Sequence, residues 1–588
     1  MDTTDLVPAE LRAQWVADGH CPGVDLMTLF SQQVDRHPDR VALVDDHGSV
    51  TYAELAAEAR RIGAYLHQAG VGPGDVVAIQ FANTHHACAA DLAVASVGAI
   101  CLAYPILYRN KEVRSLLARS GAVACLFARR FRDFDFAEMM VELRGELPGI
   151  KHLAVLGEPF PGCDSLDEVL AGPDPGVRPP VEVGPADPVR IIVTSGTEGE
   201  PKMVLFSHDG IGGGIANVLG AILIGGHPPT PAGPDKGPGR PDDDTRFLLL
   251  PPLSTGFGAL GTYAAISRFG VTLVVTSVFD PAGMFKLIER ERITHLFGVP
   301  TMLGMMLEAK PEGVDLSSLQ VVGSFGAAMS EDRVRRTIDV FSATPVAMGG
   351  GAGAPTDAAM SRQAKSHEGR ARFVNGYGCS DGAICMTGWD DPPEKIAATV
   401  GRPSPALSHI RILDDDGADV PEGEVGEVCA RGPMTPLRYF KSPDLDDRYR
   451  FDGGWVRTGD LGVIDADGYL RIAGRKKDII IRGGYNISPA EAEAALLTHP
   501  AVAEAACVGM PDERLGERMC AFLVLREGQD LPDLAEIEQH LTAAGLARIK
   551  CPERLEAIDA MPLNPTGKIL KRVLRDRIAE IVGTGARA

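Results

Sequence analysis

The feature that most constrains this chain is an alternation of short apolar runs with helix-like stretches. Apolar runs at Val41–Val44, Val76–Phe81 and Val123–Phe127 are typical of buried strands. The stretches Tyr52–Gly70 and Lys111–Ser120 between them predict helices. This strand–helix–strand order predicts an α/β fold with mainly parallel sheets covered by helices.

Further apolar runs continue this pattern at Arg190–Val193, Phe247–Leu250, Thr272–Val275 and Leu296–Val299. Two stretches interrupt it. Residues 225–244 are rich in proline, glycine and aspartate, and they predict a surface loop or a lid. Residues 348–370 begin with a glycine-rich run and have the character of an insertion that could cover a pocket, bind a partner or do neither.

Beyond Pro403, short strands and turns replace the strand–helix alternation. Residues 461–473 predict a hairpin around an Asp-Gly turn. A basic run follows at residues 475–478, and the clearest domain boundary of the chain falls just before it, near residue 474. In the compact α+β segment that follows, Ser488-Pro489-Ala490-Glu491 predicts a helix start with a capping box.

Composition excludes several classes of protein. Lysine and arginine number 58 and aspartate and glutamate 79, which gives a net charge of −21. Such a chain repels nucleic acids and anionic membranes, so we expect neither as a partner. The eleven cysteines are scattered without a Cys-x-x-Cys pair, which favours reduced thiols over disulfides or a zinc site. The N-terminus shows no signal peptide, and we expect a cytoplasmic protein that is a monomer or a homodimer.

A glycine- and hydroxyl-rich loop follows the strand predicted at Arg190–Val193. Residues 194–202 read Thr-Ser-Gly-Thr-Glu-Gly-Glu-Pro-Lys. Glycines allow the backbone to approach an anion closely, while the hydroxyls and the lysine donate hydrogen bonds to phosphate oxygens. The loop is not a Walker motif, and a solvated turn is the alternative interpretation.

Three further motifs lie downstream: Asn375–Asp381, Arg457–Asp460 and Asn564–Lys568. In this order and spacing, and together with the loop at 194–202, they resemble the adenylate-forming superfamily of acyl-CoA synthetases, non-ribosomal peptide adenylation domains and luciferases. The resemblance covers residues 25 to 580. The phosphate loop is most similar to those of cyclohexanecarboxylate-type and short-chain acyl-CoA ligases.

The resemblance implies a large N-terminal domain over residues 1–474 and a small mobile α+β domain over residues 478–588. The N-terminal domain would combine parallel sheets with a distorted β-barrel-like subdomain. Residues 475–477 would form the hinge, and Lys477 would be the hinge residue. The C-terminal domain would carry the catalytic lysine, and Gly483 and Gly484 would line the channel for a thiol arm, where glycine leaves room beside the backbone.

The implied reaction uses ATP and Mg²⁺ to convert a carboxylate into an acyl-adenylate with release of pyrophosphate, and then transfers the acyl group to CoA. Because an anionic carboxylate attacks an anionic phosphate, positive charge must be in place beforehand. Lys568 would bridge carboxylate and α-phosphate, and Asp381 would bind Mg²⁺. Asp460 would accept the ribose hydroxyls, with Arg475 also reaching the ribose. The catalytic set that the resemblance implies is Lys568, Ser380, Thr197 and Lys202.

The remaining assignments follow from the same resemblance. Tyr377 would stack on the adenine ring, and the segment from Gly326 lines the adenine. The complete ATP-binding set is Thr194, Ser195, Gly196, Thr197, Gly199, Lys202, Gly326, Ala327, Ala328, Asn375, Gly376, Tyr377, Gly378, Ser380, Asp460 and Arg475. His85, His86 and His208 have no recognisable partner in the sequence, and we expect them to be structural.

The sequence departs from its relatives around the acid pocket. Relatives place a histidine near positions 253–255, and here there is none. Phe325 replaces a smaller residue and is expected to project into the pocket beside Phe257 and Gly258. These residues predict a small carboxylic acid, flat and aromatic, alicyclic or short, rather than a fatty acid.

The acceptor stays open at this point. CoA is the leading prediction, and a carrier-protein phosphopantetheine arm, an amine, or nitrite in an ATP-dependent diazotase of aromatic amines are the alternatives. A catalytically silent nucleotide-binding scaffold is a different class of function. The presence of Lys568, Asp460 and Asp381 argues against it, because a silent protein is free to lose these residues.

Overall fold

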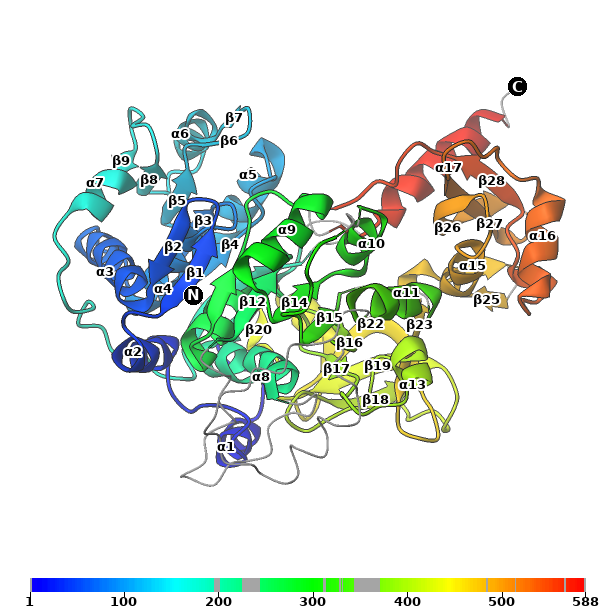
Figure 1. Ribbon diagram of the computed structural model, residues 1–588, viewed down its shortest axis with the longest axis horizontal. Helices are drawn as coiled ribbons and strands as arrows, with labels where there is room; N and C mark the ends of the chain where they lie inside the picture. Colours follow the sequence, from blue (N-terminus) through cyan, green and yellow to red (C-terminus); the bar gives the residue numbers. More distant parts are fainter. Residues whose placement is uncertain are drawn as a thin grey trace.

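The computed structural model describes residues 3–194, 201–224, 244–309, 313–326, 329, 331–342, 371–482, 485–512, 514–564 and 567–585. These residues form two large sheets, an antiparallel sheet and a separate C-terminal lobe, which is orange and red in Figure 1. The mixed α/β class predicted from the sequence is confirmed.

The first large sheet has the strand order β20-β11-β10-β4-β3-β5-β8-β9. Its strands are β3 (Val76–Gln80), β4 (Ile100–Ala103), β5 (Ala124–Ala128), β8 (His152–Leu156), β9 (Asp164–Ser165), β10 (Pro188–Val193), β11 (Met203–Ser207) and β20 (Arg438–Tyr439). All neighbours from β10 to β9 are parallel, whereas β11 and β20 extend the sheet in antiparallel fashion. The helices associated with it are α3 (Tyr52–Gln68), α4 (His85–Ser96), α5 (Asn110–Ser120), α6 (Phe136–Glu146) and α7 (Leu166–Ala171).

The second large sheet has the order β17-β16-β15-β14-β12-β13-β1-β2. Its strands are β1 (Val41–Asp45), β2 (Gly48–Thr51), β12 (Arg246–Leu249), β13 (Thr272–Val274), β14 (His295–Gly298), β15 (Val321–Ser324), β16 (Arg372–Gly378) and β17 (Ile384–Met386). Only the edge strands β2 and β17 pair antiparallel. Its helices include α9 (Pro281–Glu291), α10 (Pro300–Ala309), α11 (Glu331–Ser342) and α13 (Pro393–Ala398).

The largest apolar core joins the two sheets through α4, α8 (Ala216–Ile224) and the π-helix η2 (Leu260–Phe269). A buried polar network crosses this core. The Arg190 guanidinium pairs with Asp91 and donates to the Leu253 carbonyl at 2.7 Å, while the Tyr263 hydroxyl donates to Asp91 at 2.9 Å. The network therefore ties β10, α4 and η2 to the loop that begins at Pro251.

Residues 409–475 form the five-stranded antiparallel sheet. This sheet lies at the position where we expected the distorted β-barrel-like subdomain. Its strands are β18 (His409–Leu413), β19 (Gly426–Arg431), β21 (Arg450–Phe451), β22 (Trp455–Ile464) and β23 (Leu470–Arg475). The predicted hairpin is confirmed as β22 and β23. The short helix α14 (Pro443–Tyr449) precedes β21.

The C-terminal lobe has its own sheet and core. Its elements are the 3₁₀ turn η4 (Lys476–Asp478), β24 (Ile480–Arg482), β25 (Tyr485–Ile487), α15 (Pro489–Leu496), β26 (Val502–Asp512), β27 (Gly516–Leu525), α16 (Leu534–Ala543), β28 (Arg554–Ala557) and α17 (Lys571–Gly585). Helix α15 begins at Pro489 as predicted, but the capping box is absent. The Ser488 hydroxyl instead donates to the Ala473 carbonyl at 2.5 Å, which ties the helix start to β23.

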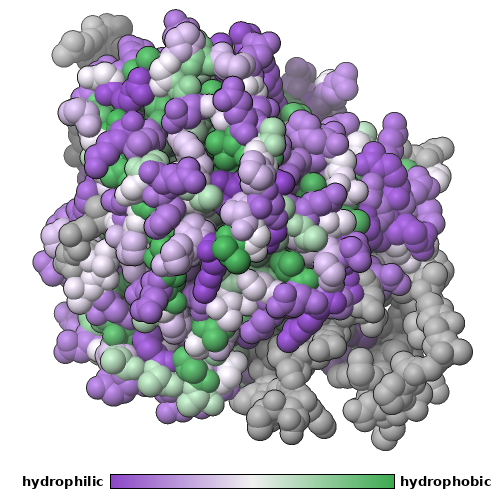
Figure 2. Space-filling view, turned by 90° about the vertical axis from the view of Figure 1, so that its left-hand side faces the viewer, coloured by the Kyte–Doolittle hydropathy of each residue, from purple (hydrophilic) through white to green (hydrophobic). Residues whose placement is uncertain are grey.

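The remaining helices at the N-terminus are α1 (Ala9–Ala17) and α2 (Leu26–Arg36), and the π-helix η1 (Gly210–Ile215) precedes α8. The face on the side of α3 and α7 carries apolar residues scattered among polar ones (Figure 2). In the described part of the chain, no helix combines the length and apolar character needed to cross a membrane.

Candidate active site

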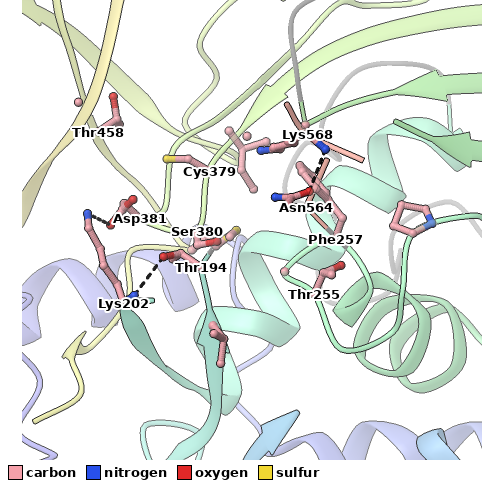
Figure 3. Close-up of a pocket in the computed structure, with 18 of the residues that line it drawn as sticks. Thr194, Lys202, Thr255, Phe257, Cys379, Ser380, Asp381, Thr458, Asn564 and Lys568 are labelled. Carbon is pink, nitrogen blue, oxygen red and sulfur yellow. Dashed lines mark hydrogen bonds and ion pairs between the residues drawn. The ribbon is translucent and has the colours of Figure 1, made fainter. Parts of the chain in front are cut away.

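A cavity of about 410 Å³ lies where both large sheets, the antiparallel sheet and the C-terminal lobe meet. Figure 3 shows Lys202 and Asp381 on one side of it and Lys568, Asn564 and Phe257 on the other. The predicted site residues that line it are Thr194, Lys202, Phe257, Gly326, Gly378, Ser380, Asp381, Arg475, Lys477 and Lys568. The lining runs from Pro105 to Lys568, so segments that are distant in sequence contribute to one cavity.

Lys568 reaches the cavity from the turn between β28 and α17. The Asn564 side chain accepts a hydrogen bond from the Lys568 backbone N–H at 2.8 Å and so fixes the turn. The Thr301 hydroxyl, at the start of α10, donates to the Gly567 carbonyl at 2.9 Å and links the turn to the N-terminal part. Burial lowers the pKa of the Lys568 ammonium, and the charge of Arg475 lowers it further. An anion entering the cavity would relieve this repulsion.

Asp460 is buried between two donors. The Tyr377 hydroxyl donates to Oδ2 of Asp460 at 2.6 Å, and the Arg475 guanidinium contacts Oδ1 at 2.9 Å. Asp460 and Arg475 are cross-strand partners on β22 and β23, so the register of the hairpin sets this ion pair. The carboxylate in turn raises the pKa of Arg475. Neither Tyr377 nor Asp460 lines the cavity itself, although Gly378, Gly459 and Arg475 beside them do.

Asp381 and Lys202 form the opposite wall. Nζ of Lys202 lies 3.5 Å from Oδ1 of Asp381 and 3.7 Å from the centre of the Tyr449 ring. The Tyr439 hydroxyl donates to the same oxygen of Asp381. Thr194 and Lys202 exchange two hydrogen bonds, from the Thr194 N–H to the Lys202 carbonyl at 3.0 Å and from the Lys202 N–H to the Thr194 hydroxyl at 3.2 Å. These bonds join the two ends of the loop at 194–202, for which phosphate binding stays a prediction.

Phe325 does not project into the cavity, contrary to our prediction. Its buried ring stacks on Phe297 with centroids 5.0 Å apart, and it lies 5.8 Å from the ring of Phe257, which does line the cavity. A Cβ on Gly376 would come within 2.0 Å of the Phe325 ring, so the ring occupies the space above this glycine. Phe325 therefore packs behind Phe257 and does not line the cavity itself.

Asn375, Gly376 and Gly258 also lie behind the cavity wall. The Asn375 amide donates to the Thr399 carbonyl at 2.9 Å and holds β16 in place. A Cβ on Gly258 would meet the Pro252 carbonyl oxygen at 1.9 Å, so this glycine permits the tight turn that presents Phe257. Direct contacts of these three residues with a substrate stay predictions.

The wall of the cavity around Phe257 is mostly apolar. Phe257, Leu260, Val299, Ile215 and Val218 contribute its hydrophobic surface. Among the described lining residues there is no histidine. Sequence reasoning missed Tyr439, Tyr449 and Thr301, because these residues lie far from the motifs they contact and no local pattern marks them.

Several predicted residues lie outside the described part of the chain. They are Ser195, Gly196, Thr197, Gly199, Ala327, Ala328, Gly483 and Gly484, together with residues 225–243 and the insertion at 348–370.

Comparison with known proteins gives the family. A family model of the AMP-binding enzymes matches residues 30–440, and a model of the AMP-binding enzyme C-terminal domain matches residues 491–568. Triostin synthetase I of Streptomyces triostinicus is 33% identical over 576 residues, which cover 97% of each chain. The 2-hydroxy-7-methoxy-5-methyl-1-naphthoate–CoA ligase of Streptomyces carzinostaticus is 31% identical, over 97% of this chain and 96% of that protein.

Among solved structures, the amide bond synthetase McbA from Marinactinospora thermotolerans matches with a TM-score of 0.76 and 30% identity, over 94% of this chain and 99% of that one. The match extends through both the large N-terminal part and the C-terminal lobe. The chain belongs to the AMP-binding enzymes, a family of the adenylate-forming superfamily that its ordered motifs indicated.

Proposed function

We propose that this adenylate-forming enzyme activates a small aromatic carboxylic acid with ATP and Mg²⁺ and then transfers the acyl group to CoA. The observation that supports it most is the convergence of Lys568 with Lys202 and Asp381 on one cavity. Two ammonium groups and a carboxylate around a space of this size suit an acid and the phosphates of a nucleotide.

In the first half-reaction, a carboxylate oxygen of the acid forms a bond with the α-phosphorus of ATP, and the bond from that phosphorus to pyrophosphate breaks. Lys568 neutralises the carboxylate and the α-phosphate as they approach, while Lys202 holds phosphate oxygens at the other wall. Mg²⁺ takes one or two carboxylates together with phosphate oxygens, and Asp381 is the described lining carboxylate that fits this requirement. The metal would supply further charge for the leaving pyrophosphate.

The nucleotide sugar would lie against Arg475 and the buried Asp460. Both oxygens of Asp460 already have donors, Tyr377 and Arg475, and a carboxylate has lone pairs left for the ribose hydroxyls. Tyr377 therefore acts as a donor to Asp460 in addition to any stacking on adenine.

The acid pocket favours a flat ring. Phe257 presents an aromatic face, and it is supported from behind by Phe325 and Phe297. The wall formed by Leu260 and Val299 is apolar. It therefore offers no charged side chain to a polar substituent of the acid that lies away from its carboxylate. The relative named for a naphthoate substrate supports the same class of acid.

For the second half-reaction we propose a rotation of the C-terminal lobe about Lys477. This residue lies in η4, between the last strand of one sheet and the first strand of another. In the rotated state Lys568 would leave the cavity and the segment with Gly483 and Gly484 would face it. The thiolate of CoA would then attack the acyl carbon, form the thioester and release AMP.

An amine is the second candidate acceptor, because the structural relative McbA is named an amide bond synthetase. ATP–pyrophosphate exchange with a panel of aryl, alicyclic and aliphatic acids tests the first half-reaction. Product analysis with CoA, phosphopantetheinylated carrier protein, amines or nitrite tests the second. We expect exchange with an aryl acid and thioester with CoA. Exchange without thioester contradicts CoA as the acceptor, and exchange with no acid contradicts acid activation.

A further inference from the structure

Three potential metal ligands that belong to none of the catalytic motifs meet at the junction of α3 with the start of α4. Nε2 of His85 lies 3.6 Å from Oε1 of Glu58, and Nδ1 of His86 lies 3.3 Å from Oε2 of Glu58. One ligand atom from each residue lies within 4.8 Å of the other two. In Figure 1 these helices pack side by side next to β1, in the blue part of the chain.

The contacts within this cluster are incomplete. Oε2 of Glu58 and Nδ1 of His86 are both buried, and neither has a hydrogen-bond partner among the described residues. The two atoms lie 3.3 Å apart, but no hydrogen bond joins either of them to a described residue, and a buried polar atom without one is unfavourable. A cation between them would satisfy both.

His85 is already oriented as a metal ligand. Its Nδ1–H donates to Oδ2 of Asp45 at 2.7 Å, and its backbone N–H donates to the same oxygen at 2.8 Å. Because an ionised carboxylate only accepts, Nδ1 carries a ring proton, and in the neutral ring Nε2, 3.6 Å from Oε1 of Glu58, has the lone pair that a metal ion needs. A carboxylate that fixes the tautomer of a ligating histidine is the usual outer partner in zinc sites.

We propose that Glu58, His85 and His86 bind a divalent transition-metal ion of the zinc class. Bonds of about 2.0–2.2 Å from a metal to nitrogen and oxygen require ligand atoms roughly 3–4 Å apart, which agrees with the two measured separations. Two imidazoles and one carboxylate select zinc-like ions over Mg²⁺, which prefers oxygen ligands. The site is therefore separate in chemistry from the Mg²⁺ site proposed at Asp381.

The position of the site gives it a structural effect on the catalytic cavity. Asn83, two residues before His85, accepts a hydrogen bond from the Leu253 N–H at 2.8 Å and donates to the Pro251 carbonyl at 3.4 Å. Pro251 lines the cavity. A bound metal would hold α3 against the start of α4. Because Asn83 joins this region to Pro251 and Leu253, the metal would also restrict motion of the loop that carries Phe257.

The test uses the full-length protein after treatment with a chelator and its removal. Zn²⁺ binding is measured by calorimetry, and Co²⁺ is used as a spectroscopic probe in visible absorption. We expect one equivalent of Zn²⁺ to bind and to raise the melting temperature. Glu58→Gln and His86→Ala should weaken Zn²⁺ binding at least about 10-fold, and Asp45→Asn should weaken it by about 10–100-fold through His85.

His67→Ala is the matched control, because His67 is an exposed histidine on the same helix, α3. It should bind Zn²⁺ as the wild type does. Circular dichroism in the presence of chelator establishes that each variant is folded, and the nearly isosteric Glu58→Gln guards against a packing defect. Absence of Zn²⁺ and Co²⁺ binding to the wild type overturns the proposal, and the cluster is then an ion pair only. Unchanged affinity in Glu58→Gln and His86→Ala also overturns it, since the ion would bind elsewhere.

Discussion

The Tyr377 hydroxyl donates a hydrogen bond of 2.6 Å to the carboxylate of Asp460, although 83 residues separate them. With Arg475 on the other oxygen, the carboxylate is held in one orientation before any nucleotide enters. This preorganisation matters because a buried carboxylate that must reorient on binding loses part of the binding energy.

Asp460→Asn tests this arrangement. The substitution keeps the size of the side chain but removes the charge that Arg475 and the ribose hydroxyls both use. Hydrogen bonds to charged groups contribute about 1.5–3 kcal/mol, so we expect ATP binding to weaken by roughly 10- to 150-fold in calorimetry. Tyr377→Phe, which leaves the charge in place, should have a smaller effect. Equal ATP affinity of Asp460→Asn and the wild type would show that Asp460 only stabilises the hairpin.

Lys568→Ala tests the bridging cation. Removing one group that stabilises transition-state charge slows a reaction by about 10²–10³-fold, so pyrophosphate exchange should fall by that factor. ATP affinity should change little, because Lys202, Arg475 and Asp460 remain. Arg572→Ala, an exposed cation on α17, is the control and should exchange at the wild-type rate. Pyrophosphate exchange by Lys568→Ala at a rate near that of the control would show that Lys568 does not take part in adenylation.

Phe257→Leu tests the acid pocket. The substitution removes the aromatic face and opens space in front of Phe325. The discrimination that such a pocket provides is about 1–3 kcal/mol per group, so kcat/KM should shift from single-ring toward larger acids by roughly 10-fold or more. The readout is exchange with matched pairs of single-ring and fused-ring acids. An equal loss of kcat/KM for all acids would instead indicate a general packing defect.

The pH dependence of stability tests the buried His208. Burial lowers its pKa to about 4 from the usual 6.5. Between these values the unfolded histidine binds a proton that the folded one does not, so stability falls as the pH drops from 6.5 to 4, by at most about 3.4 kcal/mol. Nδ1 of His208 accepts the Leu26 N–H at 3.2 Å. His208→Asn can keep such an acceptor and should reduce the drop in melting temperature between pH 7 and pH 5.

His67→Asn, at the exposed position on α3, should leave the same temperature drop unchanged. An identical drop in His208→Asn and the wild type would assign the acid sensitivity to other groups. His295 is the first of these to examine, since burial lowers its pKa to about 4 as well.

Local patterns predicted the strands well. The apolar runs at Val41–Val44 and Val76–Phe81 became β1 and β3 with shifts of one residue, and Arg190–Val193 lies within β10. These strands are buried on both faces, so their sequence is apolar throughout and the pattern is strong. The order of the motifs also predicted that Lys202, Asp381 and Lys568 serve one site, and all three line the same cavity.

Local patterns were weaker where a side chain had a choice of partners. Ser488 has the sequence of a helix cap, yet its hydroxyl donates to the Ala473 carbonyl, because β23 passes beside the start of α15. The position of Phe325 in the sequence predicted a pocket residue. Its ring instead stacks on Phe297 and fills the space that Gly376 leaves open, so it lies in the core.

The sequence by itself determined the α/β class with mainly parallel sheets and the residue types within each motif, because apolar runs and the residues of one motif are properties of neighbouring positions. Only the tertiary structure decided which distant side chains meet. It brought Tyr377 to Asp460, and it gathered Glu58 with His85 and His86, two histidines for which the sequence showed no partner. Such pairs depend on how helices and strands pack across hundreds of residues, and packing of this kind leaves no local signal in the sequence.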